Sequence, residues 1–261
     1  MLTRCRETHE APGCAALRFA TLTTLMDDKA ILDKSSAAIR GMFAEVAPRY
    51  DLLNRVLSAS LDVVWRRRCA RSLADALDGP ALDLCCGTGD QAKALQKSSQ
   101  RTVIASDFCL PMLDLAERKF RRLERKPLRL AGDALILPFH SGVFAAVTVS
   151  FGLRNFADLD VGLREIHRVL CVGGQARFLE FALPRSAWLR APYDFYLDRV
   201  LPRLGALVSP SPSAYRYLPD SVVEFPQRAD LVDRMTAAGF REAECEDFSG
   251  GTVCFYKGVV K

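Results

Sequence analysis

The sequence predicts an α/β fold: a mostly parallel, seven-stranded sheet with helices on both faces, closed by a C-terminal antiparallel hairpin. Between residues 80 and 181, short apolar runs alternate with stretches of helical periodicity, the order expected of a parallel sheet with crossover helices. The first apolar run is followed by Gly87 and Gly89 and then by a helical stretch. That is how such a sheet presents backbone N–H groups to a nucleotide-like ligand. Residues 242–248 and 252–259, joined by a glycine pair, are typical of a hairpin.

The length of 261 residues, 49% of them hydrophobic, suits one domain with additions. Residues 1–34 show little periodicity and are expected to form a loosely ordered extension. Residues 35–261 are expected to form the single domain. Within it, residues 35–79 would make an N-terminal helical cap, and residues 184–226 a helical and loop insertion on the substrate side.

The charge balance is mildly basic, since 36 Lys and Arg against 31 Asp and Glu give a net charge of +5. The short basic runs at residues 66–68 and 121–122 lie on expected helices, where a solvated face is their ordinary role. We therefore expect no nucleic-acid partner.

The nine cysteines include no C-x-x-C pair, and the three histidines lie far from any cysteine cluster. We therefore expect no metal site, and the odd number of cysteines argues against a disulfide framework. Small buried thiols of this kind are typical of a reducing, cytoplasmic compartment. No run approaches the roughly 18 apolar residues that a membrane-spanning helix needs.

Three helices are expected before the first strand. Ser35 and Ser36 are placed to cap a helix over residues 37–46, and apolar residues at helical spacing predict another over 52–57. Asp62 is placed to cap a third helix, residues 63–77. Because these helices precede the first strand, they are expected to lie over the sheet edge or the ligand cleft.

The next part of the chain is expected to alternate strands and helices. Strands are expected at residues 82–85, 102–106, 128–131, 144–151 and 175–181, and helices at 90–96, 111–123, 161–170 (capped by Asp160) and 228–238. One further helical stripe is apolar: Leu197, Val200, Leu201, Leu204, Leu207 and Val208. The stripe predicts either a core-facing helix or a surface for an apolar substrate or a bilayer.

Polar side chains stand at the ends of consecutive expected strands. Asp107 follows the second strand, where a carboxylate can accept both hydroxyl protons of a ribose; the alternative is a helix-capping Asp. Asp133 and Ala134 follow the third strand, where an acceptor and an apolar neighbour suit an adenine; the alternative is a plain turn. Thr88 and Ser150 offer hydroxyls along the same edge.

Asp83 lies inside an apolar strand, where a carboxylate is costly to bury without hydrogen bonds. We expect it to accept N–H groups of the glycine turn and so to fix the turn's shape. The glycines themselves allow the backbone to approach a ligand closely. The predicted ligand-binding set is Asp83, Gly87, Thr88, Gly89, Asp107, Asp133, Ala134 and Ser150.

Several stretches carry a resemblance to a known family. They are residues 50–58 (YDLLNRVLS) with Trp65, 82–90 (LDLCCGTGD), 149–155 (VSFGLRN), 168–170 (RVL) with Gly173 and Gly174, 179–181 (LEF) and 215–218 (YRYL). With them the sequence resembles a class I S-adenosylmethionine-dependent methyltransferase. More narrowly, it resembles the family that C-methylates the ring of demethylmenaquinol and of the ubiquinone precursor. The resemblance covers residues 41–258, and the first and third stretches are its most specific parts.

The resemblance implies a Rossmann-like fold, S-adenosylmethionine as cofactor and a polyprenylated quinol as substrate. Demethylmenaquinol is the expected quinol, and a methoxy-benzoquinol is the alternative. Three residues gain roles: Arg154 would stabilise the phenolate formed when the ring hydroxyl loses its proton, Asn155 would orient substrate or a water, and Tyr50 would cover the methyl-transfer site. Arg154 cannot be the base, because the pKa of arginine exceeds about 12. The ordinary alternative for Arg154 and Asn155 is a salt bridge and a cap at a helix start.

The sequence departs from the family pattern at four places: Leu53 replaces Met, Asp62 replaces His, Cys171-Val172 replaces Lys-Pro, and Ala182 replaces Ser. Asp62 matters most, because it can alter a contact with the substrate.

Two other classes of function share parts of this pattern. One is a non-catalytic subunit of a quinone-synthesis complex with the same fold. The other is an NAD(P)-dependent oxidoreductase, which the residue three after Gly89 disfavours, because Ala92 stands where the dinucleotide fingerprint has its third glycine. The resemblance leaves open a homodimer and a peripheral contact of the cytoplasmic protein with the membrane.

Overall fold

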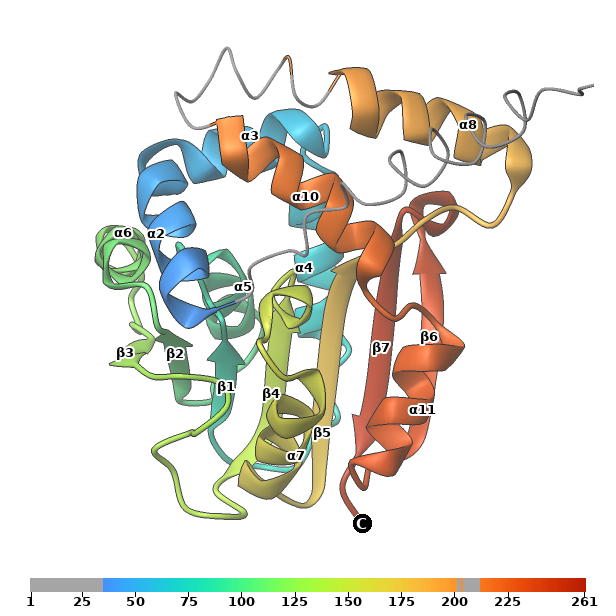
Figure 1. Cartoon of the computed structure of the whole chain (residues 1–261). Coiled ribbons are helices and arrows are strands. Elements are labelled where there is room, and N and C mark those ends of the chain that lie inside the picture. Colours follow the sequence, from blue (N-terminus) through green and yellow to red (C-terminus); the bar gives the residue numbers. More distant parts are fainter. Residues whose placement is uncertain (1–34, 201–202, 204–211) are drawn as a thin grey trace, which may run out of the picture. The chain divides into compact units, whose positions relative to one another are not determined.

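A computed structural model describes residues 35–200, 203 and 212–261 of the chain (Figure 1). The described residues form one compact unit. The loosely ordered extension expected at residues 1–34 lies outside the described residues. The boundaries proposed for the helical cap and the insertion remain predictions.

One sheet of seven strands forms the centre of this unit, in the order β3-β2-β1-β4-β5-β7-β6. The strands are β1 (Ala81–Leu84), β2 (Val103–Asp107), β3 (Leu128–Ala131), β4 (Phe144–Ser150), β5 (Leu170–Phe181), β6 (Arg241–Phe248) and β7 (Val253–Val259). Neighbouring strands are parallel from β3 to β5, whereas β7 runs antiparallel to both β5 and β6. The predicted sheet and its closing hairpin are therefore confirmed.

Helices cover both faces of this sheet. They are α2 (Ser36–Val46), α3 (Tyr50–Leu57), α4 (Leu61–Arg71), α5 (Asp90–Ser98), α6 (Leu110–Phe120), α7 (Leu159–Val169), α8 (Ala187–Phe195), α10 (Pro212–Glu224) and α11 (Ala229–Ala237). Four short turns are η1 (Ala47–Arg49), η2 (Leu153–Asn155), η3 (Tyr196–Val200) and η4 (Ser249–Gly251). In Figure 1, α2, α3 and α10 lie above the carboxyl ends of the parallel strands.

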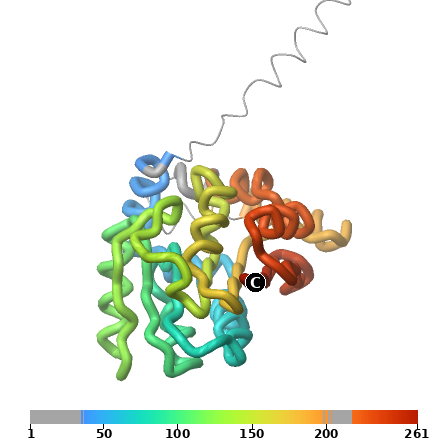
Figure 2. Tube along the Cα trace, turned by 90° about the horizontal axis from the view of Figure 1, so that it is seen from below, coloured from blue at the N-terminus to red at the C-terminus, as the bar shows by residue number. Residues whose placement is uncertain are grey.

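Two apolar cores result, one on each face of the sheet. Leu82 and Val147 pack with side chains of α7 and α11, whereas Ala81 and Ala146 pack with side chains of α4, α5 and α6. Adjacent residues of one strand divide between the cores because successive side chains point to opposite faces. From below, α7 and α11 are seen on one side of the sheet and the segment after α4 on the other (Figure 2).

One of the three expected helix caps is confirmed, and the other two are wrong. The Ser35 hydroxyl accepts a hydrogen bond from the Ala38 N–H at 3.3 Å, as expected. Two other caps were wrong. Helix α7 is capped by Asp158, whose carboxylate accepts from the Val161 N–H at 2.9 Å, rather than by Asp160. Helix α4 begins at Leu61 and ends at Arg71, so Asp62 lies inside its first turn.

The apolar stripe is only partly described. Leu197 is buried against Leu53 of α3, which fits the core-facing alternative, whereas Leu201, Leu204, Leu207 and Val208 lie outside the described residues. No helix in the described part of the chain is long and apolar enough to cross a membrane.

Candidate active site

Two pockets share Phe43 and Phe151 in their linings and therefore adjoin. The smaller, of about 70 Å³, is lined by residues that follow β2, β3 and β4. The larger, of about 350 Å³, is lined mainly by apolar and aromatic side chains of α2, α3, α4, η3 and α10. As expected, helices that precede the first strand lie over the ligand-binding edge.

Asp107 connects the glycine turn to the smaller pocket. Its two carboxylate oxygens accept hydrogen bonds from the Gly87 N–H at 2.7 Å and the Cys109 N–H at 2.9 Å. Burial raises the pKa of Asp107, and these two N–H donors oppose the rise. Each oxygen keeps a second lone pair, so the carboxylate can still accept protons from a ligand.

The turn requires glycine at position 89. Gly89 has a φ of +82°, and a Cβ there would lie 2.6 Å from the ring of Phe120. At Gly87 a Cβ would meet only the Tyr50 ring at 3.8 Å. Tyr50 therefore lies close above the turn, and it also lines the larger cavity.

Asp133 and Ala134 line the smaller pocket together with Asp107 and Phe108. One oxygen of Asp133 accepts from the Leu135 N–H at 2.9 Å, so the other is open to a ligand. The pocket thus offers carboxylate acceptors between apolar side chains, the chemistry that an adenosine group needs. The residues present fit such a group.

Asp83 does not have the contacts expected of it. It is 1% exposed, and one oxygen accepts from the Thr148 hydroxyl at 2.9 Å. Thr148 is its direct partner in the pairing of β1 with β4, so this donor stands across the strands. The backbone N–H of Ala92, in the first turn of α5, also favours the charged form of Asp83. Burial raises its pKa to about 7. Asp83 lines neither pocket.

The two predicted hydroxyls also lie behind the pockets' linings. Thr88 donates to Asp51 at 2.6 Å and accepts from the Lys119 ammonium at 2.9 Å. It therefore ties α3 to the glycine turn. The Ser150 hydroxyl is buried and has no hydrogen-bond partner among the described residues.

Arg154 stands in the wall of the larger cavity although it is 6% exposed. Its Nη1 donates to the Phe151 carbonyl at 2.6 Å and to Oε1 of Glu180 at 2.7 Å. Burial would lower the pKa of Arg154, but Glu180 together with Tyr50 and Tyr217 outweighs it and raises the pKa. Its Nε has no partner among the described residues. A fixed, buried cation therefore lies in the wall of an apolar cavity.

Asn155 lines the smaller pocket and contacts a residue of the larger one. Its side-chain oxygen accepts from the Tyr217 hydroxyl at 2.9 Å, and Tyr217 lines the larger cavity. Burial raises the pKa of Tyr217 to about 12, with Arg154 opposing the rise. Tyr217 therefore stays a neutral donor at ordinary pH.

Sequence reasoning missed two residues. Glu180 is fully buried on β5 and forms the ion pair with Arg154. Its place in the sequence, a carboxylate between the apolar residues Leu179 and Phe181, could have indicated a buried charge. Arg66 was expected on a solvated face, but it is 7% exposed. Its guanidinium lies 5.1 Å from the centre of the Phe151 ring, and its Nε has no hydrogen-bond partner among the described residues.

Asp62 explains why Arg66 turns inward. A carboxylate oxygen of Asp62 lies 3.8 Å from the Arg66 Nε and also pairs with Arg55. The other oxygen accepts from the Ser58 hydroxyl at 3.0 Å. Asp62 is the one carboxylate among the described residues that line the larger cavity.

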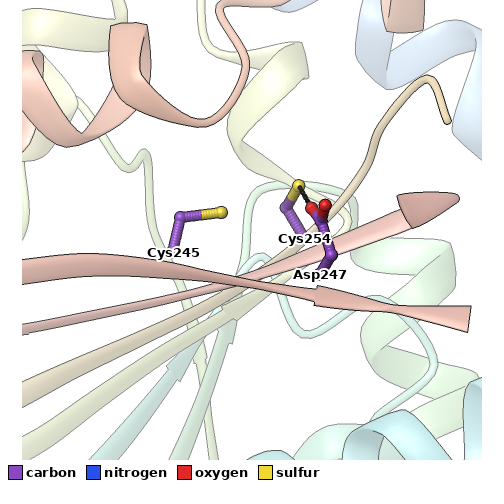
Figure 3. Close-up of side chains that lie close together, drawn as sticks. All are labelled: Cys245, Asp247 and Cys254. Carbon is purple, nitrogen blue, oxygen red and sulfur yellow. Dashed lines mark hydrogen bonds between the residues drawn. The ribbon is translucent and has the colours of Figure 1, made fainter. Parts of the chain in front are cut away.

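A separate cluster lies on the hairpin (Figure 3), where donor atoms of Cys245, Asp247 and Cys254 lie within 4.8 Å of one another. The Cys254 thiol lies 3.3 Å from an Asp247 oxygen, and the same oxygen accepts from Arg228 at 3.0 Å. Arg185 lies 3.5 Å from the other oxygen. Because two arginines already neutralise this carboxylate, the cluster is a poor competitor for a metal cation.

Comparison with solved structures agrees with the fold. A Thermotoga maritima structure, titled an S-adenosylmethionine-dependent methyltransferase and possible histamine N-methyltransferase, matches with a TM-score of 0.61 at 18% identity, covering 85% of this chain and 99% of that one. A Haloferax volcanii complex of the Trm112 activator with a methyltransferase matches with a TM-score of 0.60 at 15% identity, covering 84% and 97%.

Sequence comparison is more specific. Demethylmenaquinone methyltransferase of Deinococcus radiodurans is 46% identical over 205 residues, covering 78% of this chain and 85% of the relative. The enzyme of the same name from Mycobacterium marinum is 41% identical, covering 88% and 96%. The ubiquinone/menaquinone biosynthesis C-methyltransferase of Geotalea uraniireducens is 39% identical, covering 87% and 98%.

The model of the ubiE/COQ5 methyltransferase family matches residues 31–260, nearly the whole described part of the chain. This match overrules the oxidoreductase alternative. The chain belongs to the ubiE/COQ5 methyltransferase family and is an S-adenosylmethionine-dependent methyltransferase.

Proposed function

We propose that the chain methylates a ring carbon of a prenylated quinol, with demethylmenaquinol as its substrate. One observation carries the proposal: the buried guanidinium of Arg154 lines an apolar cavity that adjoins the pocket of Asp107. An apolar ring with ionisable hydroxyls fits such a cavity. The names of the relatives from Deinococcus radiodurans and Mycobacterium marinum support the same substrate.

The smaller pocket is the proposed site of S-adenosylmethionine. Asp107 would accept the ribose hydroxyls, while Asp133 and Ala134 would meet the adenine. Gly87 and Gly89 would let the backbone approach the rest of the molecule. When bound, the cofactor supplies a methyl group activated by a positively charged sulfur.

The larger cavity is the proposed site of the quinol ring. A ring carbon is a poor nucleophile until the neighbouring hydroxyl loses its proton, and a nearby cation lowers a pKa by about 1–3 units. The guanidinium of Arg154 is the proposed stabiliser of the resulting phenolate. Glu180 and the Phe151 carbonyl hold the guanidinium in place, so no rotamer has to be fixed during the reaction. The proton passes to a water molecule, because Arg154 cannot accept it.

Arg66 is the proposed partner of the second quinol oxygen. The rings of Phe151 and Phe181 lie 4.5 Å apart, with the Arg66 guanidinium over Phe151 and that of Arg154 over Phe181. Two buried guanidinium groups therefore flank one aromatic pair. A quinol has hydroxyls on opposite sides of its ring, and one guanidinium would serve each of them.

The remaining roles follow from position. Tyr50 would cover the place where methyl transfer occurs, since it lies over Gly87 and lines the cavity. Asn155, bonded to Tyr217, would orient the ring at the boundary between the pockets. Asp83, Thr88 and Ser150 would support the cofactor site from behind the pocket linings.

The proposed encounter with a membrane-borne quinol is peripheral. Leu52 and Val56 of α3 are 55% and 46% exposed, and Trp188 and Phe195 of α8 are 75% and 63% exposed. Leu53 and Leu57 of α3 and Tyr193 of α8 belong to the apolar cluster around Leu197, and these residues also line the larger cavity. An apolar, aromatic rim of this kind suits the headgroup region of a bilayer. A homodimer remains a prediction of the resemblance.

The test is mass spectrometry of the products made with isotopically labelled S-adenosylmethionine. Reduced demethylmenaquinone and the methoxy-benzoquinol precursor are offered in separate reactions. The proposal expects a labelled methyl group on the naphthoquinol ring. Labelling of the benzoquinol alone would assign the chain to ubiquinone synthesis, the second activity in the name of the Geotalea uraniireducens relative. Labelling of neither, with S-adenosylmethionine bound, would favour a non-catalytic subunit.

A further inference from the structure

A third pocket, of about 260 Å³, lies between α4 and α5, which pack against each other. Its lining is strongly basic. The cations are Arg55, Arg66, Arg67, Arg71, Lys93 and Lys97. Arg66 is the one residue of this lining that has a role in the proposed methyl transfer.

The described residues leave four of these six charges without a partner. Asp90 is the one carboxylate among the described residues that line the pocket, and it is already bound by Arg55 at 2.6 Å and Lys119 at 2.7 Å. The side chains of Arg67, Arg71, Lys93 and Lys97 form no ion pair or hydrogen bond within the described residues.

The four unpaired cations form two rows. Arg67 and Arg71 are four residues apart on α4, and Lys93 and Lys97 are four residues apart on α5, so each pair shares one helix face. Like charges at this spacing destabilise a helix. Two such rows lining one pocket therefore repel each other, and a bound anion would relieve this repulsion.

Arg66 also lines this pocket. It is 7% exposed, and its Nε lies 3.8 Å from an oxygen of Asp62. Its charge adds to the positive potential of the pocket, whereas its role in the proposed methyl transfer lies on the side of the apolar cavity.

We propose that this pocket binds the phosphate group of an organic phosphate. Arginines bind phosphate through paired N–H donors and lysines as point charges. The pocket's volume is several times the roughly 30 Å³ of one water molecule, and Val63 and Ala94 also line it, so there is room for a carbon-bearing group beside the phosphate. A phospholipid headgroup and a soluble polyphosphate share this chemistry.

The experiment measures binding to the full-length protein in the absence of quinol and of S-adenosylmethionine, so its result does not depend on the proposed function. One arm is flotation with phosphatidylglycerol vesicles, with phosphatidylcholine vesicles for comparison. The other is calorimetry with inorganic pyrophosphate. The variants Arg67→Gln/Arg71→Gln and Lys93→Gln/Lys97→Gln each remove one row. The matched control, Arg118→Gln/Arg122→Gln, removes two exposed charges at the end of α6.

We expect at least one probe to bind the wild type. The affinity for that probe should fall at least about tenfold in both row variants, because each loses charge-assisted hydrogen bonds to the phosphate. The control should bind like the wild type, and neither row variant should melt at a lower temperature, because repulsion has been relieved. If the protein binds phosphatidylglycerol vesicles but not pyrophosphate, the ligand is a lipid headgroup. If it binds pyrophosphate but not the vesicles, the ligand is a soluble phosphate. The proposal is overturned if neither probe binds or if the control loses as much affinity as the row variants.

Discussion

Arg154 and Glu180 form a buried ion pair, with Nη1 of Arg154 2.7 Å from Oε1 of Glu180 and the two side chains 6% and 0% exposed. The Arg154 N–H also lies 3.3 Å from the other carboxylate oxygen. The pair joins the turn after β4 to the middle of the sheet. The charge that faces the larger cavity therefore has a fixed position before any substrate arrives.

The variant Glu180→Gln should lower the free energy of unfolding by about 3–5 kcal/mol, because it leaves the Arg154 charge buried without its counter-charge. Urea unfolding measures this. The double variant Arg154→Met/Glu180→Leu removes both charges and should recover most of the loss, yet it should not methylate a quinol. Equal stability of the single and double variants would argue against a dominant ion pair.

The variant Arg154→Gln should lower turnover by about 10²–10³, the usual effect of losing one electrostatic stabiliser. The affinity for S-adenosylmethionine, measured by calorimetry, should stay within a factor of two or so, because Arg154 does not line the smaller pocket. The rate should also need a higher pH, since the phenol pKa is no longer lowered by a cation. Wild-type turnover would remove Arg154 from the mechanism.

The variant Asp107→Asn should weaken the binding of S-adenosylmethionine by about 1.5–3 kcal/mol, the range for hydrogen bonds to a charged group. Calorimetry measures it, with the exposed Asp114→Asn as control. In the wild type the affinity should fall as the pH drops through the raised pKa of Asp107, because a protonated acid accepts fewer hydrogen bonds. Unchanged affinity in Asp107→Asn would refute the ribose assignment.

The variant Arg66→Met should raise the KM for a soluble short-chain quinol about tenfold, since one charge-assisted hydrogen bond is lost. The affinity for S-adenosylmethionine should not change. The matched control is Arg67→Met, whose side chain is exposed and lines the basic pocket instead of the cavity. The same KM in both variants would leave the second quinol oxygen without its proposed partner.

The fold could be predicted because its signals are local. The alternation of apolar runs with helical stretches gave the order of strands and helices, and the glycine turn marked the binding edge. Asp107, Asp133 and Ala134 were predicted to lie together because the carboxyl ends of neighbouring parallel strands meet at one edge, and the three line one pocket. Gly89 lies where the backbone needs a positive φ. A glycine at the end of a strand is a local signal of such a turn.

Contacts between distant residues could not be predicted in the same way. Arg66 was placed on a solvated face because its neighbours are arginines, whereas Asp62 and Phe151 keep it inside. Asp83 was assigned to the glycine turn, which is near in sequence, but strand pairing placed Thr148 beside it. Asp62 lies four residues before Arg66 on the same helix, but Phe151 and Thr148 come from other elements, and the sequence around Arg66 and Asp83 does not indicate them.

Asp83 gives the protein a pH-dependent stability. Its pKa is raised to about 7 in the folded state, so the folded protein holds a proton that the unfolded chain releases near pH 4. Stability from this group is fully present below about pH 4 and is lost as the pH rises toward and through 7.

Each pKa unit is worth about 1.4 kcal/mol, and 1 kcal/mol moves the Tm by about 2–4 °C in a domain of this size. The variant Asp83→Asn, which stays neutral and can still accept from Thr148, should therefore lack this part of the decline. Thermal melts of both proteins between pH 5 and pH 8, at constant ionic strength, measure the difference, and parallel curves would show that Asp83 does not titrate in this range.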